Sequence, residues 1–230
     1  AIPTHRPCIR RLNKPRVFAT MEAKWRAVTD EIERLVNNDR AVLVGTPSVD
    51  ASEALGRMLK DKSIKHEILN ARYLEQEAEI VGNAGEPGRV IVATNMAGRG
   101  TDIKLSEALK AAGGLQVIAT EMHSSKRIDR QLIGRAARQG DPGGYQFFLS
   151  LEDELMRCHT PEKMAKKKKQ ASANAHGELS GSWLSFFTKT QRQLEKLHYK
   201  QRKDMMKQDK HRSESYRRMG LDPCLELTEN

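Results

Sequence analysis

The stretch Arg89-Val90-Ile91-Val92-Ala93-Thr94-Asn95-Met96-Ala97-Gly98-Arg99-Gly100-Thr101-Asp102-Ile103 predicts a buried strand that leads directly into a ligand-binding loop. β-branched residues dominate its first half, which is typical of a parallel strand covered on both faces. The second half holds two glycines, an arginine and an aspartate, and glycines allow a backbone to approach a phosphate closely. In open α/β sheets, ligands bind beyond the carboxyl ends of the strands.

Strand and helix patterns alternate on both sides of this stretch. Such alternation predicts a parallel sheet with helices on both faces. Strands are expected at residues 16–20, 41–47, 66–69, 115–120 and 145–151, and helices at residues 21–36, 50–59, 73–81 and 128–138. No proline or glycine interrupts residues 183–219, whose apolar side chains recur at steps of three and four, so we expect one long helix there.

Length and cysteine content limit the class of protein. With 230 residues, the chain has room for one α/β domain and an appendage. Cys8, Cys158 and Cys224 have no paired spacing, which argues against a disulfide framework or a zinc site and suits a reducing cytoplasm. No apolar run is long enough for a membrane span and no signal peptide is recognisable. The chain begins at Ala1 rather than at methionine, which is compatible with a fragment.

The net charge of +10 is concentrated in the tail. Residues 161–219 contain 16 Lys and Arg against 6 Asp and Glu, whereas residues 1–160 contain 24 against 21. A basic tail of this kind suits anionic lipid, nucleic acid or an acidic protein surface. A solvated basic helix beside a basic linker is the alternative interpretation.

Two arginines, Arg135 and Arg138, lie three residues apart in the predicted helix 128–138. That spacing places both guanidinium groups on one helix face, near the carbonyl end that favours cations. Taken alone, such a pair is typical of solvated surface. The interpretation depends on the motif that surrounds it.

The nine residues TNMAGRGTD, 94–102, resemble the fifth helicase-type motif of the SecA preprotein translocase ATPases, in their second RecA-like domain. The resemblance extends to residues 115–123, 131–143 and 150–157, covers most of residues 1–157, and includes the tail more loosely. It implies a RecA-like parallel sheet with helices on both faces, followed by a linker and a long C-terminal helix. It also implies three regions: a motor domain at 1–157 with an extended entry segment at 1–15, a basic flexible linker at 158–182, and a helical scaffold segment at 183–230.

The resemblance further implies site residues, cofactor and partners. Arg135 and Arg138 would be arginine fingers that reach the γ-phosphate, and the nucleotide cleft would be shaped by Gly98, Arg99, Gly100 and Asp102. ATP with Mg²⁺ would be shared with a first motor half, and hydrolysis would move a preprotein through a SecY-type channel. The location would be cytoplasmic, at the inner face of the cell membrane, with the basic tail available to anionic lipid.

The chain lacks the parts that grip ATP. It has neither a Gly-x-x-x-x-Gly-Lys-Ser/Thr loop nor a strand that ends in the Asp-Glu pair that helps to hold magnesium. Its seven histidines are scattered, so we expect no metal site. The isolated chain is therefore expected to be inactive as an ATPase.

The arginine motif departs from the SecA pattern, which leaves alternatives open. Ile133, Ala136 and Ala137 stand where SecA proteins usually have Arg, Ser and Gly. The string at 133–138 also resembles the excision-repair helicase UvrB, which would make nucleic acid the partner. A non-catalytic binding module is a third class.

Overall fold

The computed structural model describes residues 4–69, 80, 82, 84–94, 102–159, 162, 173–180 and 183–219. The chain divides into two compact units, residues 1–191 and residues 192–230. The elements are β1 (Arg11–Leu12), β2 (Arg16–Phe18), α1 (Met21–Val36), β3 (Val42–Thr46), α2 (Val49–Asp61), β4 (Glu67–Leu69), β5 (Val90–Thr94), α4 (Glu107–Ala111), β6 (Leu115–Ala119), α5 (Lys126–Ile133), β7 (Gly143–Ser150), α6 (Glu154–His159) and α8 (Trp183–Arg218).

The first unit is built on a seven-stranded sheet with the strand order β1-β7-β6-β3-β5-β4, and β2 also pairs with β7. Every strand pair among the described residues is parallel. The central strand β3 aligns Val44 with Val92 of β5 on one side and with Ile118 of β6 on the other. All five residues of β3 are buried, as expected for a strand covered on both faces.

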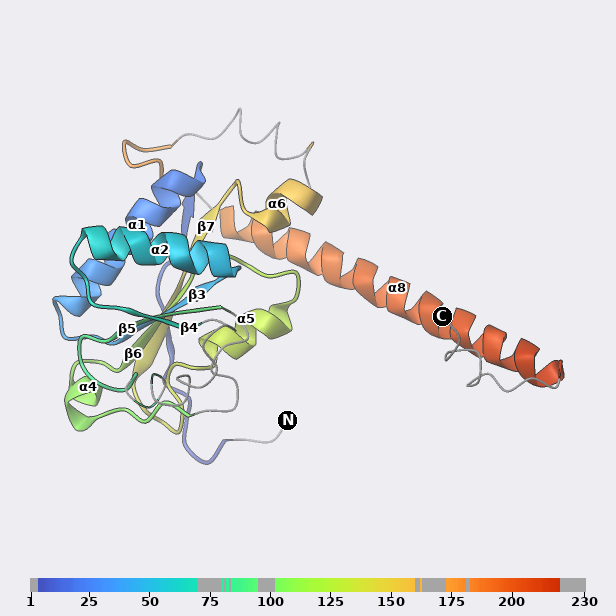
Figure 1. The fold of residues 1–230 in the computed structure, drawn as a ribbon, viewed down its shortest axis with the longest axis horizontal. Helices are drawn as coiled ribbons and strands as arrows, with labels where there is room; N and C mark the ends of the chain where they lie inside the picture. Colours follow the sequence, from blue (N-terminus) through green and yellow to red (C-terminus); the bar gives the residue numbers. More distant parts are fainter. Residues whose placement is uncertain are drawn as a thin grey trace. The chain divides into compact units, whose positions relative to one another are not determined.

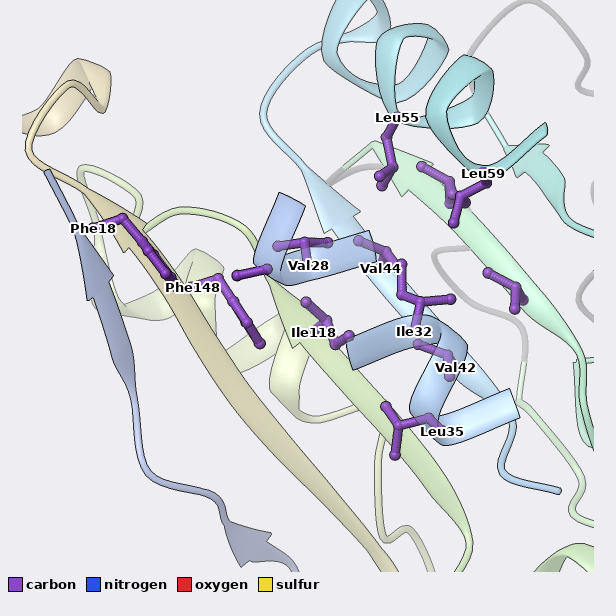
Figure 2. Packing of buried hydrophobic residues seen from close by; sticks show 13 residues of the cluster. Phe18, Val28, Ile32, Leu35, Val42, Val44, Leu55, Leu59, Ile118 and Phe148 are labelled. Atoms are coloured by element: carbon purple, nitrogen blue, oxygen red, sulfur yellow. The ribbon is translucent and has the colours of Figure 1, made fainter. Parts of the chain in front are cut away.

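Helices α1 and α2 cover one face of this sheet (Figure 1). Figure 2 shows their apolar side chains, among them Val28, Ile32 and Leu55, directed at the strand residues Val44 and Ile118. Thr20 and Ser48 cap these two helices by accepting hydrogen bonds from Ala23 N and Ala51 N. The regular spacing of apolar residues explains why the sequence predicts α1 with its correct bounds.

Helix α5 packs against the opposite face. A Cβ atom on Gly45 of β3 would lie 2.3 Å from Leu132 Cδ2 of α5, so the missing side chain at position 45 allows this close approach. Gly45 follows Val44 in the strand, and successive strand residues face opposite sides of a sheet. Helices therefore lie on both faces, and the predicted fold class is confirmed.

The structure differs from the sequence prediction at several elements. The short elements β1, α4 and α6 were not predicted. The predicted helix 128–138 is wrong at its end, because α5 runs from Lys126 to Ile133. After Ile133, the amides of Arg135 and Ala136 bond to carbonyls three residues earlier, which tightens and ends the helix. The predicted helix 73–81 lies almost entirely outside the described residues.

Part of the predicted linker belongs to the sheet-containing unit. Leu179 N donates to Val17 O at 2.8 Å and Ala19 N donates to Gly177 O at 3.0 Å, so residues 173–180 lie beside β2. Arg16 adds an ion pair to Glu178 at 2.8 Å. These eight described residues are held against the sheet rather than forming a free linker, and the other predicted boundaries stay predictions.

The long C-terminal helix predicted at 183–219 is confirmed as α8. Its first turns, through Gln191, belong to the first unit, where Phe187 is fully buried. The remainder belongs to the second unit and exposes Leu197, Tyr199, Met205 and Met206.

Candidate functional site

A tight turn after α5 carries the two predicted arginine fingers. We call residues 135–140 the finger turn. Ala137 and Gln139 both have φ of 52°, and Gly140 has φ of 83°, so the chain passes through the left-handed region three times in four residues. That region is unfavourable for residues with a Cβ atom, and it turns the backbone sharply away from the helix axis.

The Arg138 side chain closes this turn from both ends. Its Nε donates to Gly134 O at 3.1 Å, which satisfies a carbonyl at the C-terminus of α5. Its Nη1 lies 2.9 Å from Asp102 Oδ1, and Gln139 Nε2 donates to Asp102 Oδ2 at 3.2 Å. Asp102 therefore receives donors from two residues of the finger turn, on both of its carboxylate oxygens.

This contact joins segments that are distant in the sheet. Asp102 lies beyond the end of β5, whereas the finger turn precedes β7, and β3 and β6 separate these two strands. The sequence placed the ligand loop beyond the carboxyl end of β5. In the structure, the partner of that segment is the loop that enters β7.

Arginines of the entry segment hold the finger turn from its other side. Arg10 Nε donates to Ala136 O at 2.8 Å, and Arg6 Nη1 lies 3.5 Å from Gln139 O. Between these groups lies a cavity of about 800 Å³, which is within the size range of small-molecule sites. It is lined by Thr4, His5, Arg6, Cys8, Arg10, Asp102, Ala137, Arg138, Gln139 and Gly140.

The chemistry of this cavity suits an anionic ligand. Three arginines line it, and the single carboxylate, Asp102, is already paired with Arg138. Guanidinium groups bind phosphate through paired N–H donors, so polyphosphate fits this lining. No group of three His, Cys, Asp or Glu side chains that could hold a metal ion occurs among the described residues.

The structure brings together only some of the predicted site residues. Arg138 and Asp102 are in contact, and Arg135 lies in the same turn, half-buried. Gly98, Arg99 and Gly100 lie outside the described residues. Gln139, Arg6 and Arg10 were missed; the basic, proline-containing entry segment was visible in the sequence, but its contact with a turn more than 120 residues away was not.

A buried ion pair lies at the C-terminal ends of β6 and β7. Lys24 Nζ of α1 lies 2.6 Å from Asp153 Oδ1 and 2.8 Å from Thr120 O. Burial raises the pKa of Asp153, against the opposing effect of the Lys24 ammonium. This pair fixes α1 to the ends of both strands.

A second polar cluster lies beside it, after β6. His123 Nδ1 lies 2.6 Å from Asp129 Oδ1, and His123 Nε2 lies 3.3 Å from Glu121 Oε1. Burial raises the pKa of Glu121 to about 7, and the neighbouring His123 opposes that rise. The sequence singled out Glu121 and His123 only as part of a family string.

No described helix combines the length and the apolar composition that crossing a bilayer requires.

Comparisons with known proteins match this architecture. The SecA P-loop domain family matches residues 7–112 and 106–175. Protein translocase subunit SecA of Cytophaga hutchinsonii is 48% identical over 213 residues, which are 90% of this chain and 19% of that protein. The SecA subunit of Bacteroides fragilis is 56% identical over 164 residues, 71% of this chain and 15% of that protein. The chain thus spans less than a fifth of the length of these two relatives.

Similarity to a solved structure supports the fold and says nothing of function. The E. coli DEAD-box protein SrmB, in a complex with regulator of ribonuclease activity A, is similar with a TM-score of 0.52 and 22% sequence identity. The match covers 66% of this chain and 83% of that chain.

Proposed function

Because the chain belongs to the SecA P-loop domain family, we propose that it is the second RecA-like half of a SecA-type motor and supplies arginine fingers to ATP. The observation that carries this proposal is the contact of Arg138 with Asp102 at 2.9 Å, beside a cavity lined by two further arginines. The guanidinium of Arg138 is held on a carboxylate at the edge of a space large enough for a nucleotide.

The finger turn would act on charge. During phosphoryl transfer, negative charge spreads over the γ-phosphate oxygens, and an arginine placed there stabilises the transition state. Arg138 would exchange Asp102 for a phosphate oxygen while its Nε remains on Gly134 O, so the side chain would keep one anchor. Asp102 would then face the ribose or phosphate side of the cleft, with Gly98, Arg99 and Gly100 and with Arg135 as the second finger.

The groups missing from this chain would come from a first motor half. Such a half would supply the phosphate-cradling loop and the carboxylates for Mg²⁺. Hydrolysis in the joint cleft would open and close the two halves and move a preprotein through a SecY-type channel. The motor would work at the cytoplasmic face of the membrane, and its basic tail would contact anionic lipid.

Replacement of Arg138 tests this assignment in the complete two-half motor. Arg138→Ala should lower ATP turnover by about 10³-fold or more and change ATP binding far less, because a finger acts on transition-state charge. Arg130→Ala, an exposed arginine of α5, is the matched control. Near-normal turnover of Arg138→Ala would exclude the finger role, and an equal loss of binding would identify Arg138 as a structural residue.

The stimulating polymer identifies the class of motor. The family match favours polypeptide over nucleic acid, so an unfolded preprotein should stimulate ATP hydrolysis by the complete motor and single-stranded DNA should not. Stimulation by DNA alone would favour the UvrB-like helicase. Absence of turnover with any first half would favour a non-catalytic binding module.

A further inference from the structure

A buried hydrogen-bond network joins the first turn of α5 to the first turns of α8. Asp129 of α5 is only 5% exposed. Its Oδ1 accepts hydrogen bonds from the backbone N of His123 at 3.0 Å and from Nδ1 at 2.6 Å. Its Oδ2 accepts one from Gln191 Nε2 of α8 at 2.6 Å.

Gln191 uses both of its amide hydrogens in this network. Besides Asp129, its Nε2 donates to His123 O at 2.8 Å. Both partners are acceptors, so only the NH₂ end of the amide can occupy this position. Gln191 is 3% exposed, and loss of its donors would leave a buried carboxylate and a buried carbonyl short of partners.

The network fixes the element that carries the finger turn. Helix α5 has eight residues, Asp129 lies in its first turn, and the finger turn follows its last residue. Leu132, the last residue but one of the helix, is seated against Gly45. A rotation or shift of the helix at Asp129 would therefore displace Arg135 and Arg138.

We propose that Gln191 is a positioning residue for ATP hydrolysis, which acts by clamping α5 through Asp129 and His123 so that the arginine fingers keep their place. This inference rests on the proposed function. Gln191 is also the last residue of the first unit, and the helix that carries it continues to Arg218 in the second unit. The clamp thus connects the first turns of α8, which belong to the first unit, to the element that carries the fingers.

Gln191→Met tests the clamp in the complete two-half motor, because methionine keeps the length of the side chain and removes both donors. A displacement of about 1 Å costs up to about 10²-fold in rate, so we expect turnover to fall about 10- to 100-fold with ATP affinity unchanged. Gln191→Asn, which keeps the amide but is one methylene too short to reach both acceptors, is a second variant that preserves the polarity of the side chain.

Gln146→Met is the matched control. Gln146 is a buried glutamine of β7 whose Nε2 donates to Lys14 O at 2.8 Å. Amide hydrogen exchange in residues 126–133 should accelerate in the two Gln191 variants and stay unchanged in Gln146→Met. Combination with Arg138→Ala adds a test through the finger itself: if Gln191 acts through Arg138, Gln191→Met should cause little further loss of turnover in that background.

The outcomes separate the two proposals. Low turnover of Arg138→Ala with normal turnover of both Gln191 variants would overturn the clamp alone. The clamp alone would also be overturned if Gln191→Met lowered turnover as much in the Arg138→Ala background as in the wild type. Unchanged amide hydrogen exchange in α5 of the Gln191 variants would have the same consequence. Normal turnover of Arg138→Ala would overturn the finger role, and the positioning role of Gln191 with it.

Discussion

Replacement of Lys24 should destabilise the protein far more than replacement of a solvent-exposed lysine. Lys24 is 0% exposed, and its ammonium contacts Asp153 and the carbonyl of Thr120. Lys24→Met keeps most of the volume of the side chain but leaves Asp153 as a buried carboxylate without its counter-charge. Breaking a buried pair from one side costs about 3–5 kcal/mol, and we expect a loss in that range.

The double variant provides the decisive comparison. Asp153→Asn alone should also destabilise, because it leaves the Lys24 ammonium buried beside a neutral amide. Lys24→Met combined with Asp153→Asn removes both charges, so its loss should be smaller than the sum of the two single losses by about 2 kcal/mol or more. Urea denaturation followed by circular dichroism measures all four proteins under the same conditions.

Additive losses would refute this reasoning. If the double variant equals the sum of the single variants within about 0.5 kcal/mol, the two charges do not depend on each other and the interior around them is solvated. Lys62→Met provides the control, since Lys62 forms ion pairs with Asp30 and Glu33 at the surface. Exposed pairs contribute at most about 1 kcal/mol.

Three further predictions concern pH, backbone strain and activity. Between pH 4.5 and about 7, Glu121 keeps its proton in the folded state and releases it in the unfolded state, so the free energy of unfolding falls as pH rises through this window. Glu121→Gln removes this titration. Urea denaturation at pH 5 and at pH 8 should therefore show that its free energy of unfolding, relative to that of the wild type, is about 2 kcal/mol higher at pH 8 than at pH 5. Ala137→Gly should be about 1–2 kcal/mol less costly than Ala136→Gly in thermal denaturation, because only Ala137 of these two buried alanines has a positive φ; equal losses would contradict strain at Ala137. The isolated chain should show no phosphate release with ATP, and a first motor half added in trans should restore turnover that depends on Arg135 and Arg138; turnover by the chain alone would contradict the division of the site between two halves.

The sheet could be predicted because local sequence determines it. The β-branched run at 90–94 and the strand at 42–46 are buried on both faces, so nearly every residue in them is apolar or small and indicates a buried strand. Helix α1 was predicted within its correct bounds because its apolar spacing is regular. The two-residue strand β1 has no such local signal, since its pairing depends on Gly144 and Tyr145.

The site was harder to predict, because its geometry depends on positions where residue type and conformation disagree. Gly134 is the C-cap of α5 and the one local stop signal in the string at 133–138, whereas Ala137 adopts the left-handed conformation that glycine favours and so gave no sign of the turn that follows. Lys24 is fully buried, although lysine is seldom buried, and no pattern in the sequence indicated it. Gln191 and Asp129 are 62 positions apart, and no spacing rule connects them.

The parallel pairing of β1 and β2 with β7 has a consequence for the order of folding. Leu12 aligns with Tyr145, so this strand can pair only after more than 130 further residues have been synthesised. At about 5–20 residues per second, translation imposes a delay of roughly 7–26 s. Strand β3 pairs with β5 and with β6 over shorter separations. Arg10, directly before β1, therefore reaches Ala136 late, and the cavity beside Arg138 forms among the last parts of the sheet-containing unit.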